Sequence, residues 1–258
     1  DATSHQPRTR EVAMVNFEEK VKARYAKQAA EGVDRLLKRP ELAKLQLSYR
    51  QMADLKAYAE RHGIEFLCTP FDVEAVLALH EMNVKRLKIS SGCIRNSEVL
   101  KTAAATHLPI ILSTGMSGLA DVHAALGHLG HDWPAEHAKR PVTLLHCTSA
   151  YPCPIQDVNL RAMEAMQFRW GNRCGIGYSD HTQGITVAIA AAARGASVIE
   201  KHLTLDRMMD GPDHLSSIEP DDFRVMVSAI RTVEEALGDD MKKPRESEAG
   251  TMKIWGIA

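Results

Sequence analysis

The chain has little of what marks several large classes of protein. Aromatic residues make up 5% of its 258 residues and the formal net charge is −1, which argues against the concentrated positive charge of a protein that binds nucleic acid or an anionic membrane surface. No run of about 18 consecutive apolar residues occurs, so we expect no membrane-spanning helix. The first ten residues, DATSHQPRTR, are polar throughout, so we expect no secretory leader.

Cysteine is also scarce and follows no pattern. The five cysteines are an odd number without paired spacing, which argues against a disulfide framework or a zinc ribbon. Three of them, Cys68, Cys147 and Cys174, lie in apolar runs, and we interpret them as small core residues. Unpaired cysteines are typical of a reducing compartment, so we expect the protein in the cytoplasm.

From residue 64 onward, short apolar runs alternate with helical patterns. Such runs are typical of parallel strands buried on both faces, and their alternation with helices predicts an α/β fold. We expect strands at 65–69, 86–90, 109–114, 142–148, 174–179 and 197–202. We expect helices at 41–62, with Ser48 and Gln51 as a capping box, and at 72–81, 97–106, 119–129, 159–167, 183–194 and 220–238.

Composition divides the chain into three parts. Residues 1–44 are polar with helical composition, residues 45–240 carry the strand–helix alternation, and residues 241–258 read as a linker or tail. Polar residues follow every expected strand, whereas an open α/β sheet binds its ligand at a single switch point. The sequence also contains no GxGxxG or P-loop motif. A ring of polar strand ends is typical of a barrel, so we predict a TIM (β/α)8-type barrel.

The segment 175–214 carries the most informative pattern. One expected strand runs into His181, an Ala-rich helix follows, and the next strand runs into His202. In a βαβ unit the two strands are parallel, so both histidines should face the same mouth of the sheet. Two converging imidazoles predict a divalent metal site with room for a substrate, although a single histidine at a strand end is more often only a hydrogen-bonded polar residue.

Hydroxyl groups and one lysine lie at the other strand ends. One lysine among several hydroxyls suits a phosphate or carboxylate, although serine and threonine also simply end strands and cap helices. Their recurrence at several strand ends favours an anion site, and a metal beside it indicates a metal-assisted reaction on an anionic small molecule. The candidate residues are Thr69, Lys88, Ser91, Ser113, Ser149 and Ser179.

Eight short words at these positions resemble the N-acetylneuraminate (sialic acid) synthase family, which includes the legionaminic and pseudaminic acid synthases. They occur in the family's order, cover about residues 45–240, and are most specific at GYSDHT and VIEKHLTLDR. The words are TPFD (69–72), LKISSG (87–92), PIILSTGM (109–116), LLHCTSAYPCP (144–154), DVNLRAM (157–163), GYSDHT (177–182), VIEKHLTLDR (198–207) and GPDH (211–214).

The resemblance implies a TIM barrel that condenses phosphoenolpyruvate with an N-acylated hexosamine, such as N-acetylmannosamine. The products are a nonulosonic acid and phosphate, released with C–O cleavage. The family's small molecules are thus the implied partners, together with a second copy of the chain in a homodimer. The resemblance implies that Mn²⁺ or Mg²⁺ is held by His181 and His202 and polarises the sugar's aldehyde.

The same resemblance implies roles for the remaining candidates. Phosphoenolpyruvate is expected on Thr69, Lys88, Ser91, Ser113, Ser149 and Ser179. Tyr151 and Asp213 are expected to face the sugar or the metal-bound water. Glu200 is expected to support the metal or to shuttle protons; the alternative is a structural salt bridge, for example with Lys201.

Four departures from the family pattern bear on activity. Residues 1–44 do not match the two first βα units, which supply a Glu and a Lys to the anion site, and residues 241–258 do not match the C-terminal antifreeze-like domain. Cys93 stands where an acidic residue near the sugar is common, and Ser149 where Asn is common. We therefore expect a barrel without its first two βα units in this chain, with two open edges and little or no synthase activity of the isolated chain.

Two other interpretations stay open. A non-catalytic barrel remnant would bind metal and an anionic sugar or act as an interaction protein, which the unmatched Glu and Lys favour. An octulosonate phosphate synthase would share the barrel and the cosubstrate, but the words GYSDHT and GPDH argue against it. Phosphate release that requires both a metal and an amino sugar distinguishes an enzyme from a remnant.

Overall fold

The computed structural model describes residues 46–131, 141–211 and 213–257. The chain forms two compact units, residues 1–87 and residues 88–258, and the division falls within strand β1. The prediction for residues 1–44 lies outside the described residues, and the three-part division of the chain stays a prediction.

The first unit contributes two described helices, α3 (Tyr49–Arg61) and α4 (Val73–Glu81). Helix α3 begins where the sequence predicts, because Ser48 accepts a hydrogen bond from the Gln51 amide and the Gln51 side chain accepts one from the Ser48 amide. Asp72 caps α4 by accepting a hydrogen bond from the Ala75 amide at 2.7 Å. The expected strand at 65–69 is wrong, because no backbone ladder joins it to a neighbour within the described residues and a strand is defined by that ladder.

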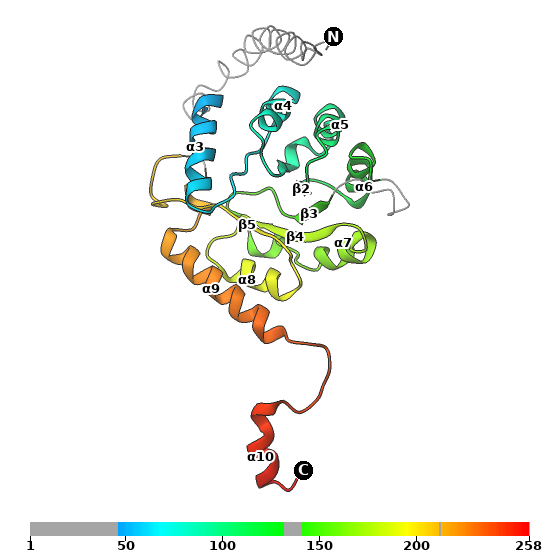
Figure 1. Cartoon of the computed structure of the whole chain (residues 1–258), viewed down its shortest axis with the longest axis vertical. Helices are drawn as coiled ribbons and strands as arrows, with labels where there is room; N and C mark the ends of the chain where they lie inside the picture. Colours follow the sequence, from blue (N-terminus) through cyan, green and yellow to red (C-terminus); the bar gives the residue numbers. More distant parts are fainter. Residues whose placement is uncertain (1–45, 132–140, 212, 258) are drawn as a thin grey trace, which may run out of the picture. The chain divides into compact units, whose positions relative to one another are not determined.

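A five-stranded sheet organises the second unit (Figure 1). Its order follows the chain, β1-β2-β3-β4-β5, and the pairs from β2 to β5 are parallel. Chain order with helical crossovers is the connectivity of a barrel. The strands are β1 (Leu87–Ile89), β2 (Ile110–Ser113), β3 (Val142–His146), β4 (Gly175–Asp180) and β5 (Ile199–Lys201), so five expected strands are confirmed within a few residues.

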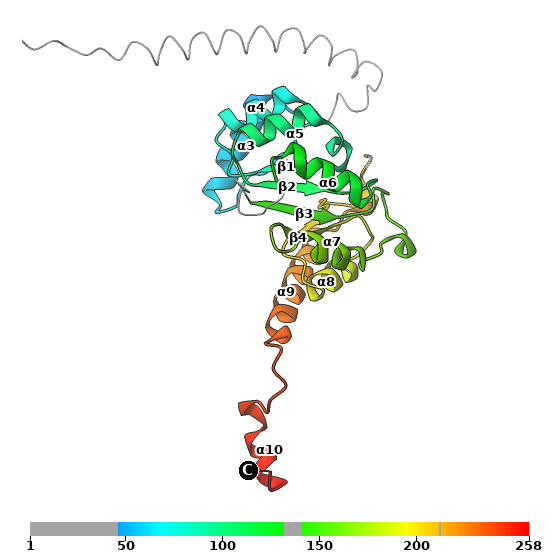
Figure 2. The ribbon, with the colours of Figure 1, turned by 90° about the vertical axis from the view of Figure 1, so that its right-hand side faces the viewer.

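Helices between the strands cover the outside of this sheet (Figure 2). Helices α7 and α8 pack against β4, α8 also packs against β5, and α9 packs against α8. The connecting helices are α5 (Ser97–Ala105), α6 (Leu119–His128), α7 (Ala162–Trp170) and α8 (Thr186–Ala193), followed by α9 (Pro220–Leu237), which starts with proline and ends at Gly238. Strands β1 and β2 are buried along their whole length, as the apolar runs predict.

An ion pair between the two end strands shows that the sheet curls. The Nζ atom of Lys88 on β1 lies 3.3 Å from the Oε2 atom of Glu200 on β5. Neighbouring strands are about 4.8 Å apart, so the end strands of a flat five-stranded sheet would lie roughly 19 Å apart, beyond the reach of these two side chains. The described strands therefore form part of a closed curve, and the predicted fold class, an α/β fold of the TIM-barrel type, is confirmed.

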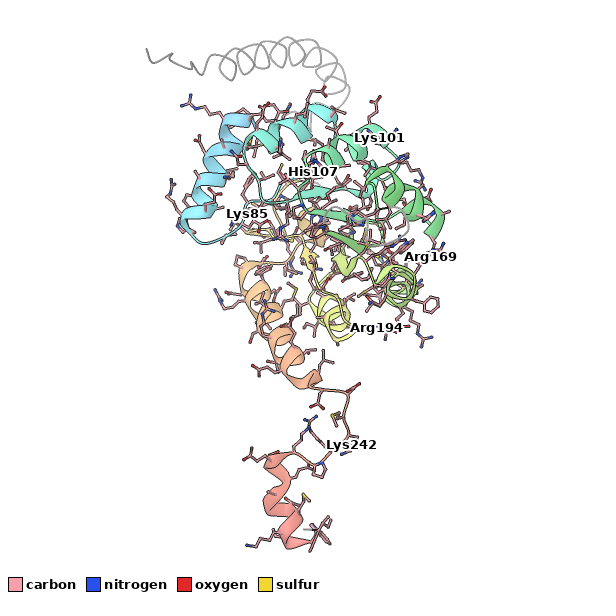
Figure 3. The ribbon with its side chains drawn as sticks, turned by 45° about the vertical axis from the view of Figure 1, so that its right-hand side comes forward. Lys85, Lys101, His107, Arg169, Arg194 and Lys242 are labelled. Carbon is pink, nitrogen blue, oxygen red and sulfur yellow. The ribbon has the colours of Figure 1, made fainter. Side chains whose placement is uncertain are left out.

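The remaining elements lie outside this framework. Three single 3₁₀ turns, η1 (Ser91–Cys93), η3 (Ile155–Asp157) and η4 (His214–Ser216), follow strands, and the expected tail contains η5 (Glu246–Glu248) and α10 (Ala249–Ile254). Basic side chains such as Lys101, Arg169 and Arg194 project outward from α5, α7 and the end of α8 (Figure 3). Among the helices of the described ranges, none combines the length and apolarity needed to cross a bilayer.

Candidate active site

The site lies where β4 and β5 end. Their register pairs Ser179 with Glu200 and Asp180 with Lys201. Because successive side chains of a strand point to opposite faces, Ser179 and Glu200 share one face and Asp180 and Lys201 the other. Since Glu200 reaches Lys88 across the curl of the sheet, the first pair faces the barrel interior.

Three of the predicted residues form a charged cluster inside the barrel. Ser179 Oγ donates a hydrogen bond to Glu200 Oε1 at 2.7 Å, and the buried Lys88 ammonium lies 3.3 Å from Glu200 Oε2. The salt bridge considered between Glu200 and Lys201 is not formed; Lys201 pairs with Asp180 on the opposite face. Glu200 therefore lies beside a cation and a hydroxyl that both belong to the predicted anion site.

The two predicted metal ligands converge. The ring centroids of His181 and His202 are 5.4 Å apart in an edge-to-face arrangement, and the Tyr151 ring lies 4.2 Å from the first and 5.6 Å from the second. Asp213 Oδ2 is 3.8 Å from His202 Nδ1. The expectation that both histidines face the same mouth is confirmed, and the two residues predicted to face the sugar, Tyr151 and Asp213, adjoin them.

The orientation of His181 is set by the chain beside it. Its Nδ1 atom lies 2.7 Å from the Thr148 carbonyl oxygen, which can only accept, so Nδ1 carries the proton and Nε2 keeps a lone pair. Burial lowers the pKa of His181, an effect opposed by the Thr148 hydrogen bond, and so favours the neutral ring. The Nε2 atom lies 3.5 Å from Ser179 Oγ. A backbone carbonyl that fixes one nitrogen and leaves a lone pair on the other is the arrangement usual for a metal-binding histidine.

The two histidines fit a divalent ion that takes its remaining ligands from elsewhere. Within the described ranges, no three His, Cys, Asp or Glu side chains are grouped closely enough to hold an ion by themselves. The pair formed by His181 and His202 supplies two imidazole nitrogen donors, so the other coordination positions would fall to water or substrate oxygens. Such a set fits a catalytic site that stays open to its substrate better than a closed structural site.

A second cluster of predicted residues surrounds Gly115. Its amide donates to Ser91 Oγ at 2.9 Å, and that hydroxyl lies 3.2 Å from Cys147 Sγ. A Cβ atom built on Gly115 would lie 2.3 Å from Ser149 Oγ, 2.9 Å from Ser91 Oγ and 3.0 Å from Cys147 Sγ. Three polar side chains thus pack closely against the backbone at residue 115, where only glycine leaves room for them.

Two further anion-site candidates differ in their placement. Ser113 is buried at the end of β2, and its Oγ atom has no hydrogen-bond partner within the part of the chain that the structure describes. A buried hydroxyl without a hydrogen-bond partner is unusual in a protein, and an oxygen atom of a bound ligand would supply that partner. Thr69 is half-buried in the first unit, so the structure does not place it with the other candidates.

Sequence reasoning missed several groups that hold the site together. Gly115 and Cys147 were not singled out as contacts of Ser91, and the Thr148 carbonyl was not expected to orient His181. Gly115 directly follows a predicted strand end in PIILSTGM, and the other two lie beside Ser149 in LLHCTSAYPCP. Position next to a predicted ligand was thus the available signal, but the contacts themselves depend on how strands far apart in sequence are brought together.

Comparisons with known proteins identify the family of the chain. A profile of the NeuB family matches residues 1–242. The N,N'-diacetyllegionaminic acid synthase of Campylobacter jejuni is 44% identical over 212 residues, covering 82% of this chain and 62% of that protein. The human N-acetylneuraminate-9-phosphate synthase is 37% identical over 202 residues, covering 77% and 54%.

Solved structures give the same answer for the fold. The N-acetylneuraminic acid (sialic acid) synthetase of Leptospira borgpetersenii, crystallised with citrate, superposes with a TM-score of 0.76 at 32% identity, covering 84% of this chain and 73% of that one. The chain spans 62% of the length of the Campylobacter relative and 54% of the human one.

Proposed function

The chain belongs to the NeuB family, and on this premise we propose that the protein condenses phosphoenolpyruvate with an N-acylated hexosamine, such as N-acetylmannosamine, to a nonulosonic acid and phosphate. The observation that carries the proposal is the convergence of His181 and His202, with ring centroids 5.4 Å apart, beside the cluster of Lys88, Glu200 and Ser179. The relatives named as sialic and legionaminic acid synthases support the reaction class.

The anion end of the site would bind phosphoenolpyruvate. Lys88 supplies the positive charge, and the hydroxyls of Ser91, Ser113, Ser149 and Ser179 supply hydrogen bonds. The unpartnered, buried Ser113 hydroxyl supports this role, because a phosphate or carboxylate oxygen would satisfy it. Thr69 is proposed as a further contact on the strength of its position in TPFD.

The metal end would bind the acceptor sugar. We propose His181 and His202 as ligands of a divalent ion, which when bound would act as a Lewis acid on the aldehyde oxygen of the open-chain sugar. Two imidazole donors suit Mn²⁺ better than Mg²⁺, since Mg²⁺ favours oxygen ligands more strongly. Burial, and then the nearby Cys147, Asp213 and Glu200, raise the pKa of Tyr151, so its hydroxyl stays protonated and can donate to a sugar oxygen.

The bonds that form and break in this reaction indicate which proton transfers the side chains would have to make. A C–C bond forms between C3 of phosphoenolpyruvate and the aldehyde carbon, and the aldehyde oxygen takes up a proton. Water adds to C2 and gives up one proton. The C2–O bond to phosphate then breaks while the new C2 hydroxyl gives its proton to the departing phosphate, which leaves a 2-keto acid. Glu200, which lies beside Lys88 and accepts from Ser179, would move a proton at C2, and Asp213 would hold the sugar or a water near His202.

Turnover tests the reaction and binding tests the site. In the 258-residue chain we expect Mn²⁺ and phosphoenolpyruvate to bind, measured by calorimetry, with little phosphate release, which should depend on both Mn²⁺ and an N-acylated hexosamine. The panel of acceptors includes free and phosphorylated sugars. If this chain releases phosphate at nearly the rate of a full-length relative, the low activity expected of it is contradicted. If a protein of the relatives' full length binds both ligands but releases no phosphate, a non-catalytic role is favoured.

Substitution of the proposed ligands localises the metal. His181→Ala and His202→Ala should each weaken Mn²⁺ binding by at least about 100-fold, since each removes one of two protein ligands. His123→Ala, an exposed histidine on α6, is the matched control and should leave binding unchanged. If the Mn²⁺ affinity is unchanged in both ligand variants, the proposed metal site is wrong. The homodimer, the cytoplasmic location and the identity of the acceptor stay predictions.

A further inference from the structure

The residues that directly precede both proposed metal ligands form an ion pair behind the site. Asp180 precedes His181 and Lys201 precedes His202, and the two are registered partners at the ends of β4 and β5. The Asp180 Oδ2 and Lys201 Nζ atoms are 2.9 Å apart, and the two side chains are 0% and 1% exposed. Because they point away from Ser179 and Glu200, they touch neither proposed substrate.

Thr182 extends this pair to the other side of His181. Asp180 Oδ1 accepts hydrogen bonds from the Thr182 amide at 2.9 Å and from the Thr182 hydroxyl at 2.8 Å. The Lys201 ammonium also donates to the Thr182 carbonyl, and the buried Tyr178 hydroxyl lies 3.5 Å from Asp180 Oδ1. The backbone on both sides of His181 is thus tied to the residue that precedes His202.

Stability alone does not explain a fully buried ion pair. The desolvation of two charges offsets most of their attraction, and an apolar pair of similar volume stabilises a core at least as well. An apolar pair could not form the hydrogen bonds that Asp180 and Lys201 together make with the amide, hydroxyl and carbonyl groups of Thr182. The network therefore fixes geometry at the strand ends, at the point where the two imidazoles leave the sheet.

We propose that Asp180 and Lys201 are positioning residues that hold the imidazoles of His181 and His202 at the spacing required for one divalent ion. The inference rests on the proposed function, since it needs the metal site. Groups behind a metal ligand commonly change affinity by 10- to 100-fold when they are removed, because they set the orientation of the ligand.

The test is metal affinity in variants that keep the interior neutral. In Asp180→Asn/Lys201→Met both charges are removed together, so neither is left buried without its partner. We expect Mn²⁺ to bind about 10- to 100-fold more weakly to the folded double variant, and the visible absorption of bound Co²⁺ to change in shape, because the ligand geometry is altered. A network with a purely structural role would change thermal stability and leave both of these readouts unmoved.

A gentler pair of substitutions covers the case in which the double variant does not fold. Thr182→Val keeps the volume and removes one hydrogen bond to Asp180, whereas Thr182→Ser keeps the hydroxyl. We expect Thr182→Val to weaken Mn²⁺ binding by about 10-fold, at the low end of such effects, and Thr182→Ser to bind like the parent chain. Arg95→Met/Asp121→Asn, which removes an ion pair between the turn after η1 and helix α6, should leave Mn²⁺ affinity unchanged.

The outcomes separate this inference from the proposed function. Suppose that the parent chain binds Mn²⁺ through His181 and His202, and that the folded double variant binds it equally well with the same Co²⁺ spectrum. The positioning role is then wrong, whereas the metal site is still supported. If the double variant does not fold, the same result for Thr182→Val leads to the same conclusion. If the parent chain binds no Mn²⁺, the metal site and the positioning role fall together.

Discussion

Gly115 occupies a position where a methyl group has no room. Its built Cβ atom meets Ser149 Oγ at 2.3 Å, Ser91 Oγ at 2.9 Å and Cys147 Sγ at 3.0 Å, so these side chains would have to move. We predict that Gly115→Ala weakens phosphoenolpyruvate binding by at least about 10-fold, equivalent to about 1.4 kcal/mol, because the added methyl group displaces the hydroxyls proposed to bind it. Calorimetric titration of the variant measures the change.

The neighbouring Gly118 provides the control. A Cβ atom there would meet only the Asp121 Oδ2 atom at 3.9 Å, an ordinary contact. Gly118→Ala should therefore bind phosphoenolpyruvate like the parent chain. Equal loss in both variants would mean that the loop as a whole, and not the space at Gly115, determines the binding.

Cys174 shows how burial alone changes the chemistry of a side chain. Burial raises the pKa of its thiol to about 11, an effect slightly opposed by the Arg173 charge. At pH 8 roughly 0.1% of such a thiol is ionised, against about a quarter of an ordinary thiol with a pKa near 8.5. We predict that iodoacetamide modifies Cys174 at least about 100-fold more slowly than a free thiol, followed by mass spectrometry of its peptide.

The pH dependence of this reaction has a definite direction. Below the pKa the thiolate fraction rises about tenfold for each pH unit, so alkylation of folded Cys174 should accelerate about tenfold from pH 8 to pH 9. In urea the same cysteine should react at the ordinary rate. A rate for the folded chain that levels off near pH 9 would contradict the raised pKa.

Among the secondary-structure elements, helix α3 depends on its cap more than most. None of its residues is buried, so burial contributes little to its stability and the capping box of Ser48 and Gln51 contributes a large share. We predict that Ser48→Ala destabilises the helix by about 1 kcal/mol, seen as hydrogen exchange roughly fivefold faster at the amides of its first turns. Ser48→Thr keeps the hydroxyl and should exchange like the parent chain; equal exchange in Ser48→Ala would show that the cap is dispensable.

Helix boundaries illustrate what sequence patterns leave undetermined. The pattern places a helix at 159–167, but α7 begins at Ala162, because Asn159 adopts a positive φ of 46° that a helix cannot contain. The α3 start, in contrast, was predictable because the capping box is a local chemical signal. Local hydrogen bonding can be read from neighbouring residues, whereas the loop before α7 is shaped by contacts such as the His146 bond to the Val158 carbonyl.

At the scale of the whole molecule, the ion pair between Lys88 and Glu200 links the two ends of the sheet. Lys88 is buried, so loss of its partner leaves a charge that water does not solvate well. We predict that Glu200→Gln lowers the free energy of unfolding by about 1–3 kcal/mol in urea denaturation. Adding Lys88→Met should restore part of the loss, because no unpaired charge remains.

A surface ion pair of the same type is the comparison. Arg207 and Glu219 are 3.8 Å apart and each is 42% exposed, so Glu219→Gln should change the free energy of unfolding by less than about 1 kcal/mol. If Glu200→Gln and Glu219→Gln lower the free energy of unfolding by similar amounts, the ion pair across the barrel interior stabilises the fold no more than a surface ion pair does.

The sequence by itself determined the α/β class, five of the six expected strands and the identity of most candidate site residues. These follow from local signals, namely apolar runs, caps and polar strand ends, which neighbouring residues carry. The word pair GYSDHT and VIEKHLTLDR likewise marked His181 and His202 without knowledge of any distance.

Only the tertiary structure decided which of these residues meet. Glu200 pairs with Lys88, 112 residues earlier, and not with the adjacent Lys201, because successive strand side chains face opposite ways and the sheet curls. The close packing at Gly115 and the buried pair of Asp180 and Lys201 exist for the same reason. Spacing along a chain gives the face on which a side chain lies, but the curvature of the sheet decides what lies opposite.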